Sequence, residues 1–187
     1  MTTAKSLIDE LYEVEGKAEI VNGEIVRMSP SGGWPGLAAI NIIGRLLEYK
    51  RRTRRGYVFA DNVGFLADIP GRKSFSPDVA YYTGALKELR GAEGLSFLEG
   101  APIFAVEIRS EYDYGKGAER KIAKKIRDYF TAGTLVVWDV DLLSETPIVS
   151  YRTDDPDNPI AFRRGEIANA EPAVPDWAFP VDELFLE

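Results

Sequence analysis

Two acidic residues stand inside apolar stretches in the middle of the chain. Asp78 follows Pro77 and leads into Val79, and Glu107 interrupts the apolar run at 104–108. Short apolar runs of this kind predict buried strands. A buried carboxylate is costly unless a cation compensates it. Whatever the chain folds into must therefore bring positive charge, from a metal ion or from basic side chains, to Asp78 and Glu107.

The surrounding segments predict an α/β arrangement. Residues 37–55 and 115–132 have helical spacing, the first with Ile40, Ile43, Leu46 and Leu47 as its apolar positions and the second ended by Gly133. Strands are expected at 57–67, as one strand or as two divided near Gly64, and at 75–82, 101–109 and 134–140. We therefore expect one domain over 1–187, with a mixed β-sheet flanked by two long helices.

The two ends of the chain add smaller elements. A short amphipathic helix is expected at 6–13. A hairpin is expected at 18–26, because Asn22-Gly23 between two β-branched runs favours a tight turn. The polar segment 83–100 suggests a short helix near Leu86. Late strands are expected at 147–152 and 160–164, around a turn at 154–159, followed by a last helical turn at 181–186.

Composition narrows the chemistry. The chain has no His and no Cys, which excludes histidine bases, Ser-His-Asp triads and metal sites built from imidazole or thiolate. The absence of Cys fits a reducing compartment. No apolar run approaches 18 residues and the N-terminus lacks a signal-peptide pattern, so we expect a cytoplasmic protein without a membrane span. The net charge of −7 argues against a broad nucleic-acid-binding surface, but not against a local basic groove.

Strand geometry predicts how the two acids could meet. Side chains alternate along a strand, so Glu107 shares a face with Arg109 while Ile108 points the other way. If the strands that carry Asp78 and Glu107 are neighbours, both carboxylates can reach one point. With the Ile108 carbonyl and waters they would complete the shell of Mg²⁺, with Mn²⁺ as an alternative.

Helix geometry singles out one lysine. With Ile122, Ile126 and Tyr129 on the inner face of the helix, Lys125 flanks that face and Lys124 points nearly away from it. Lys125 could therefore reach the acids. Its ammonium could orient a water or stabilise charge on a scissile phosphate.

These motifs together resemble a known family. The chain is similar to the Uma-type restriction endonuclease family in an ordered set of motifs. These are the opening segment 23–30, Pro77-Asp78, Glu107-x-x-Ser110, Lys125-x-x-x-Tyr129-x-x-x-Gly133, Trp138 and the closing Glu183-Leu184-Phe185. That family belongs to the PD-(D/E)XK nuclease-like superfamily. The resemblance implies a restriction-endonuclease-like core and a metal-dependent endonuclease. Asp78 and Glu107 would be its metal ligands and Lys125 its catalytic lysine.

The chain also departs from the pattern. The superfamily's lysine two positions after the glutamate is Arg109 here, and arginine cannot act as a base, so Lys125 would have to supply that role. Such families often carry a further acid, for which Glu24 is our candidate and Glu48 the second choice. A histidine common after the Ser-Pro loop is absent, and Trp34-Pro35-Gly36 stands there instead.

Each residue also has a purely structural interpretation. Asp78 could be an ordinary strand-end acid, Glu107 and Arg109 could form an ion pair on one strand, and Lys125 could be a lysine at the boundary with solvent. The basic run at 50–55 could complement a helix C-terminus or contact phosphate. Tyr112 and Tyr114 could stack on a base or simply lie in a surface loop.

Two functions remain open from the sequence. The first is a Mg²⁺-dependent endodeoxyribonuclease that hydrolyses phosphodiester bonds, as a homodimer that places one site on each DNA strand. The second is an inactive or weakly active module on the same fold that binds nucleic acid or a protein partner. Arg109 in place of lysine and the net charge of −7 favour the second.

Overall fold

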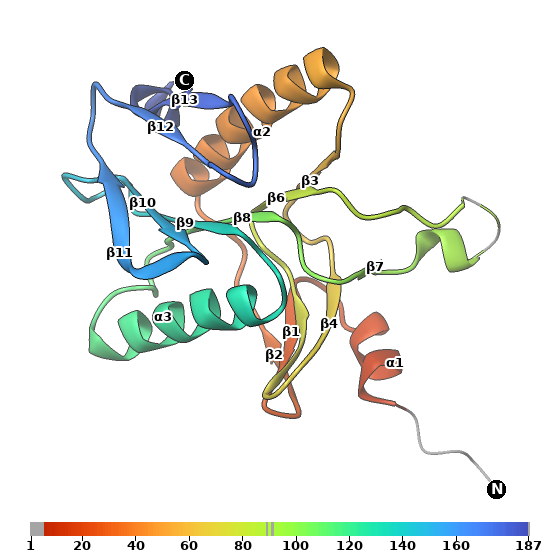
Figure 1. Ribbon diagram of the computed structural model, residues 1–187. Coiled ribbons are helices and arrows are strands. Elements are labelled where there is room, and N and C mark those ends of the chain that lie inside the picture. Colours follow the sequence, from red (N-terminus) through yellow and green to blue (C-terminus); the bar gives the residue numbers. More distant parts are fainter. Residues whose placement is uncertain (1–5, 89, 91, 187) are drawn as a thin grey trace, which may run out of the picture.

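The computed structural model describes residues 6–88, 90 and 92–186. Figure 1 shows the chain with its helices and strands labelled. The helical elements are α1 (Leu7–Tyr12), α2 (Gly33–Thr53), α3 (Lys116–Thr131) and the 3-10 turns η1 (Ala92–Leu95) and η2 (Val181–Phe185). The strands are β1 (Ala18–Val21), β2 (Glu24–Arg27), β3 (Tyr57–Ala60), β4 (Phe65–Ile69), β5 (Arg72–Phe75), β6 (Val79–Tyr82), β7 (Leu98–Glu99), β8 (Phe104–Ile108), β9 (Val136–Val140), β10 (Ile148–Arg152), β11 (Asp155–Phe162), β12 (Ile167–Asn169) and β13 (Ala178–Pro180).

A six-stranded mixed sheet forms the centre of the fold. Its strand order is β11-β10-β9-β8-β6-β3, with β8 and β9 parallel and the other neighbours antiparallel. Helix α2 and the C-terminal segment pack on one face, and α3 packs on the other. The predicted mixed sheet between two long helices is confirmed.

A second sheet, with order β2-β1-β5-β4-β7, contains the predicted N-terminal hairpin. Strands β1 and β2 pair with Val21 opposite Glu24, and Asn22 and Gly23 form the turn with positive φ. The prediction of a single strand over 75–82 is wrong, because β5 ends at Phe75 and β6 begins at Val79. Residues 76–78 carry the chain from β5 in this sheet to β6 in the central one, and Pro77 has no N–H to continue a ladder. Asp78 therefore lies where the two sheets meet.

The two long helices differ in how well their spacing predicted them. Helix α3 begins after Gly115 and ends at Thr131, as expected. Helix α2 begins earlier than expected, at Gly33, because Pro35 is tolerated in the first turn, where N–H groups have no partner within the helix. Its inward stripe is Ala38, Ile42, Leu46 and Tyr49. The prediction that Ile40 faces inward is wrong, because its side chain is 64% exposed.

Three further expectations need correction. Among the residues described around Leu86 no helix forms, and the polar segment carries η1 at Ala92–Leu95 instead. The turn expected at 154–159 belongs largely to β11, whose prolines are tolerated because β11 is an edge strand. The pairing of β12 with β13 was not predicted. In the part of the chain that the structure describes, no helix is both long and apolar enough to cross a membrane.

Candidate active site

Asp78 lies beside the strand that carries Glu107. The Asp78 N–H donates to the Val106 carbonyl at 3.1 Å, and the Ile108 N–H donates to Asp78 Oδ2 at 2.7 Å. These two bonds bracket Glu107 along β8. Residues far apart in the sequence are thus brought together at the ends of β6 and β8, as the sequence predicted.

Glu107 faces helix α3. Its Oε2 accepts a hydrogen bond from Lys125 Nζ at 2.7 Å, and its Oε1 accepts one from the Tyr129 hydroxyl at 2.6 Å. Lys125 and Tyr129 are one turn apart, so both reach inward from the same helix face. Lys124 instead bonds Asp128. The predicted placement of Lys125, rather than Lys124, beside Glu107 is confirmed.

A third acid, Glu19 of β1, completes the group and was missed by the sequence analysis. Glu19 is 3% exposed, and its Oε1 accepts from the Ser76 N–H at 2.9 Å and lies 2.9 Å from Lys125 Nζ. Its other oxygen pairs with Arg72, which also bonds Asp128 at 2.9 Å. Glu19 therefore shares Lys125 with Glu107 and ties it to the second sheet.

The two acids proposed from the sequence as additional members lie elsewhere. Glu24 is exposed at the start of β2, at the hairpin tip. Glu48 is exposed on α2, on the opposite face of the central sheet, and pairs with Arg45. Strand alternation places Glu19 on the face of β1 opposite Ile20, but nothing in the local sequence indicates that this face is also covered.

Lys17, just before β1, is the second lysine at the site. Its Nζ lies 2.6 Å from Asp78 Oδ1 and 2.7 Å from Asp61 Oδ1. Lys17 and Glu19 are two residues apart, so an extended chain points both in the same direction. We call the following residues the acid–lysine cluster: Lys17, Glu19, Asp78, Glu107, Lys125 and Tyr129.

Burial and charge set the protonation of the cluster. Burial raises the pKa of Glu107, and the carboxylates of Asp78 and Glu19 add to this, while Lys125 and Lys17 oppose it. Burial acts to lower the pKa of Lys125, but Glu107 and Glu19 outweigh it and raise that pKa. Burial, with Glu107 and Glu19, raises the pKa of the Tyr129 hydroxyl well above its usual value. At neutral pH Lys125 and Tyr129 are therefore hydrogen-bond donors.

The donor atoms at this place suit a hard divalent cation. Mg²⁺ prefers oxygen ligands and is commonly held by one or two carboxylates with waters. Asp78 bonds the Ile108 N–H next to Glu107, so two carboxylates lie in the same region of the fold. Within residues 6–88, 90 and 92–186, no three acidic side chains are arranged to hold a metal ion by themselves. A cation here would use two carboxylates, and the remaining ligands would be carbonyl, water or phosphate oxygens.

The sequence matches the model of the Uma2 family, described as "Putative restriction endonuclease", over residues 8–182. The chain belongs to the Uma2 family. Among solved structures it is similar to the crystal structure of a putative nuclease belonging to DUF820 from Anabaena variabilis ATCC 29413. The TM-score is 0.73 at 17% identity, over 95% of this chain and 96% of that one, which confirms the predicted fold class. No curated protein matches.

In this member of the Uma2 family, Arg109 is directed away from the cluster. Its guanidinium bonds both carboxylate oxygens of Asp139, at 2.9 and 2.7 Å, and pairs with Glu119 of α3. The alternative of an ion pair between Glu107 and Arg109 is therefore wrong, because Asp139 and Glu119 hold Arg109. Arg109 joins β8, β9 and α3, and Lys125 is the basic residue that contacts Glu107.

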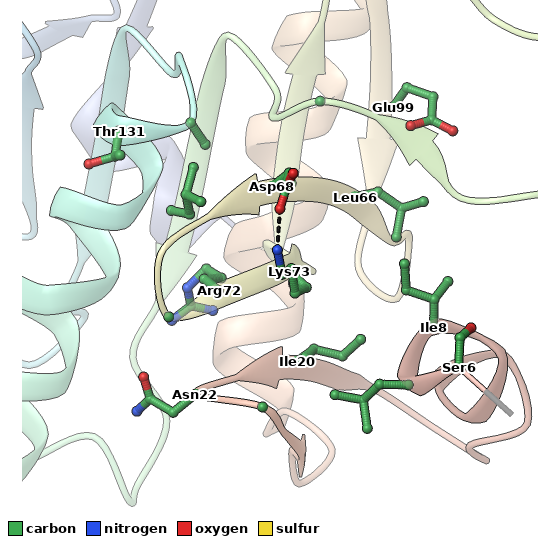
Figure 2. A pocket seen from close by; sticks show the side chains of 17 residues that line it. Ser6, Ile8, Ile20, Asn22, Leu66, Asp68, Arg72, Lys73, Glu99 and Thr131 are labelled. Carbon is green, nitrogen blue, oxygen red and sulfur yellow. Dashed lines mark hydrogen bonds and ion pairs between the residues drawn. The ribbon is translucent and has the colours of Figure 1, made fainter. Parts of the chain in front are cut away.

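One hollow of about 1010 Å³ lies apart from the acids, between α1 and the second sheet, where its wall includes Ile20, Leu66 and the Asp68–Lys73 ion pair (Figure 2). A smaller hollow of about 150 Å³ lies directly beside Asp78 and Ile108, against the N-terminal half of α2. Of these two hollows, the smaller one is lined by a residue of the acid–lysine cluster, Asp78.

Tyr112 and Tyr114 lie in the loop between β8 and α3. Tyr112 is 73% exposed, and the Tyr114 hydroxyl donates to Asp141 at 2.9 Å. Burial and Asp141 raise the pKa of Tyr114 to about 12. This placement matches the surface-loop interpretation.

Proposed function

We propose that the protein is a metal-dependent endonuclease that hydrolyses phosphodiester bonds in DNA. One observation carries the proposal: Asp78, Glu107 and Lys125 come from three separate segments and lie together, because Asp78 bonds the Ile108 N–H next to Glu107 and Lys125 bonds the Glu107 carboxylate. The same set is what the family resemblance implies for a nuclease site. Membership of the Uma2 family, and the likeness in fold to a solved structure described as a putative nuclease, support it.

The roles of the residues follow from their contacts. Asp78 and Glu107, with the Ile108 carbonyl, would hold Mg²⁺, or Mn²⁺ in its place. The ion would neutralise charge on the phosphate and lower the pKa of a bound water. Lys125 stays protonated, so it offers positive charge to a phosphate rather than acting as a base. Tyr129 and Glu19 fix Glu107 and Lys125 respectively.

A second function is favoured by one specific observation. Glu107 and Asp78 already have partners on both carboxylate oxygens, from Lys125, Tyr129, Lys17 and the Ile108 N–H. Such a closed network is self-sufficient without metal. It is what an inactive module that binds nucleic acid or a protein partner would retain for stability.

Glu107→Gln separates the two functions. The substitution keeps the size of the side chain and removes one hard ligand. We expect DNA cleavage with Mg²⁺ or Mn²⁺ to fall at least about a hundredfold, as when one preorganised electrostatic group is lost. The assay uses supercoiled, linear and single-stranded DNA and RNA, and circular dichroism checks folding.

The matched control is Glu48→Gln, which removes an exposed acid from α2 and should leave cleavage unchanged. Equal activity of wild type and Glu107→Gln would reject the metal-nuclease mechanism. Failure of the wild type to cleave any substrate would leave the binding module as the function. The homodimer and the cytoplasmic location stay proposals, and sedimentation equilibrium tests the first.

A further inference from the structure

Lys17 occupies the outer side of the Asp78 carboxylate. Asp78 Oδ2 is fixed by the Ile108 N–H, and Lys17 Nζ lies 2.6 Å from the other oxygen, Oδ1. The Lys17 side chain is only 12% exposed. The Ile108 N–H thus occupies Asp78 Oδ2, and the Lys17 ammonium already occupies Oδ1, the oxygen that a metal ion would otherwise bind.

Within the acid–lysine cluster, Lys17 and Lys125 offset two of the three negative charges of Glu19, Asp78 and Glu107. Arg72, outside the cluster, also pairs with Glu19. A divalent cation added to this arrangement is repelled by Lys17 at close range.

The Lys17 ammonium has a second carboxylate partner, Asp61. Asp61 follows β3 and lies 2.7 Å from the same Nζ, and its side chain is 44% exposed. Lys17 therefore bridges an inner carboxylate, Asp78, and an outer one, Asp61. A small swing of the lysine stem would move the ammonium wholly onto Asp61 and free Asp78 Oδ1.

We propose that Lys17 is an internal counter-cation of the site, and that a divalent metal ion binds by displacing its ammonium from Asp78 onto Asp61. This inference rests on the proposed function, because it assumes that Asp78 is a metal ligand. It adds a residue that the nuclease motif does not include. Lys17 is a positioning residue in this scheme, since it acts through Asp78.

Calorimetric titration of the full chain with Mn²⁺ and Mg²⁺, without nucleic acid, tests the proposal. Lys17→Met keeps the length of the side chain and removes its charge, so we expect the metal Kd to fall about tenfold or more. The matched control is Lys73→Met, which removes one positive charge from the exposed Asp68 pair and should leave Kd unchanged. Lys17→Gln serves as the second variant if circular dichroism shows Lys17→Met to be unfolded.

A double-mutant cycle with Asp61→Asn sharpens the test. In the wild-type background Asp61→Asn removes the second place for the ammonium, so metal binding should weaken. In the Lys17→Met background the same substitution should have much less effect. If Asp61 instead attracts the metal directly, it weakens binding equally in both backgrounds, and the proposal is rejected.

The outcomes separate this inference from the proposed function. An unchanged or weaker Kd in both Lys17→Met and Lys17→Gln, with wild type binding metal, rejects the displacement of Lys17 and leaves the nuclease proposal standing. Binding that appears only after Lys17 is neutralised supports displacement. Absence of binding in the wild type and in both Lys17 variants rejects the metal site itself, and both proposals with it.

Discussion

The central sheet packs apolar side chains on both faces, and its α3 face also holds the acid–lysine cluster. On the α2 face, Trp138 packs against Phe104, Trp177 and Phe179 with ring centroids 5.1 to 6.0 Å apart. On the α3 face, the acid–lysine cluster is held by charged hydrogen bonds. Strand β8 contributes side chains to both faces. Phe104, Val106 and Ile108 point to the α2 face, and Glu107 points to the α3 face.

The difference shows how the fold keeps charged groups in its interior. The apolar face stabilises the sheet by removing large aromatic surfaces from water, so the opposite face can carry a network whose net contribution to stability is small. Among the described residues, the one buried side-chain polar atom without a partner is the indole nitrogen of Trp177, on the apolar face. The charged face is fully paired instead. Substitutions on the two faces should therefore have different consequences.

Trp138→Ala tests the apolar face and has the largest expected effect. Trp138 is fully buried, and its loss leaves a cavity among three aromatic rings. We expect the free energy of unfolding to fall by about 3–5 kcal/mol, measured by urea denaturation. Trp34→Ala is the control, because Trp34 is 50% exposed and its loss should change stability little. Equal effects would show that the α2 face is not the main source of stability.

Glu19→Gln tests whether the charged face also stabilises the fold. It leaves Arg72 and Lys125 short of a buried partner, and we expect a loss of about 3 kcal/mol at pH 7. Burial acts to raise the pKa of Glu19, but Lys125 and Arg72 outweigh it, so the folded-state pKa is lowered. The stabilisation is therefore complete above the unfolded pKa, about 4.3, and is lost as pH falls through the lower folded pKa.

The measurement is the stability difference between wild type and Glu19→Gln across pH. It should be constant from neutral pH to about pH 5 and shrink below about pH 4.3. Asp68→Asn, which removes an exposed acid from the second sheet, should show no measurable difference. A difference that grows on acidification would mean that the charge of Glu19 destabilises the fold.

Sequence patterns predicted the fold where one periodicity dominated. Helix α3 was placed within one residue at each end, because glycine at 115 and 133 bounds a clear apolar stripe. The stripe of α2 was predicted in part: Leu46 is buried and Ile43 packs against the core, but Ile40 is exposed, and the buried Ala38 and Ile42 were not named. Alanine carries little hydrophobic signal, so its role emerges only when another element packs closely against it.

The sequence predicted those residues of the acid–lysine cluster that belong to the family motif. Asp78, Glu107 and Lys125 meet as expected. Lys17 and Glu19 were not found, because they come from the second sheet, and no local pattern states that this sheet docks beside β8. The distant partners of Arg109, Asp139 and Glu119, were equally hidden. Long-range contacts of this kind depend on how the sheets are placed, and spacing within one strand carries no information on that.

Lys125→Ala and Arg109→Ala compare the two basic residues near Glu107. Lys125 contacts Glu107, whereas Arg109 is bound by Asp139 and Glu119. We expect Lys125→Ala to lower the cleavage rate about a hundredfold at saturating Mg²⁺, with little change in metal affinity because an ammonium is not a ligand. Arg109→Ala should cost less than about tenfold and act mainly on stability. The reverse order of rates would identify Arg109 as the electrostatic partner of the site.

The basic run at 50–55 gives the smallest expected effect. It lies at the C-terminal end of α2, whereas the hollow beside Asp78 adjoins residues 35–43 of the same helix. Ile43, the residue of this range nearest to the basic run, is about 16 Å from Arg54 along the helix axis. The Arg54 N–H donates to the Lys50 carbonyl and closes the helix, and the Lys50 ammonium lies over the Tyr57 ring at 5.3 Å. The distance from the hollow and the contact of Lys50 with Tyr57 favour a role in complementing the helix C-terminus over phosphate binding.

Joint replacement of Arg51 and Arg54 by Gln should therefore leave the salt dependence of DNA binding unchanged. Fluorescence anisotropy at several salt concentrations measures it, in the Glu107→Gln background so that DNA stays intact. Each lost phosphate contact would flatten the slope of log K against log salt by about 0.9. A flattening of that size would place the run in the DNA interface. An unchanged slope would confine DNA contacts to other surfaces, because capping cations at the end of α2 release no counterions from DNA.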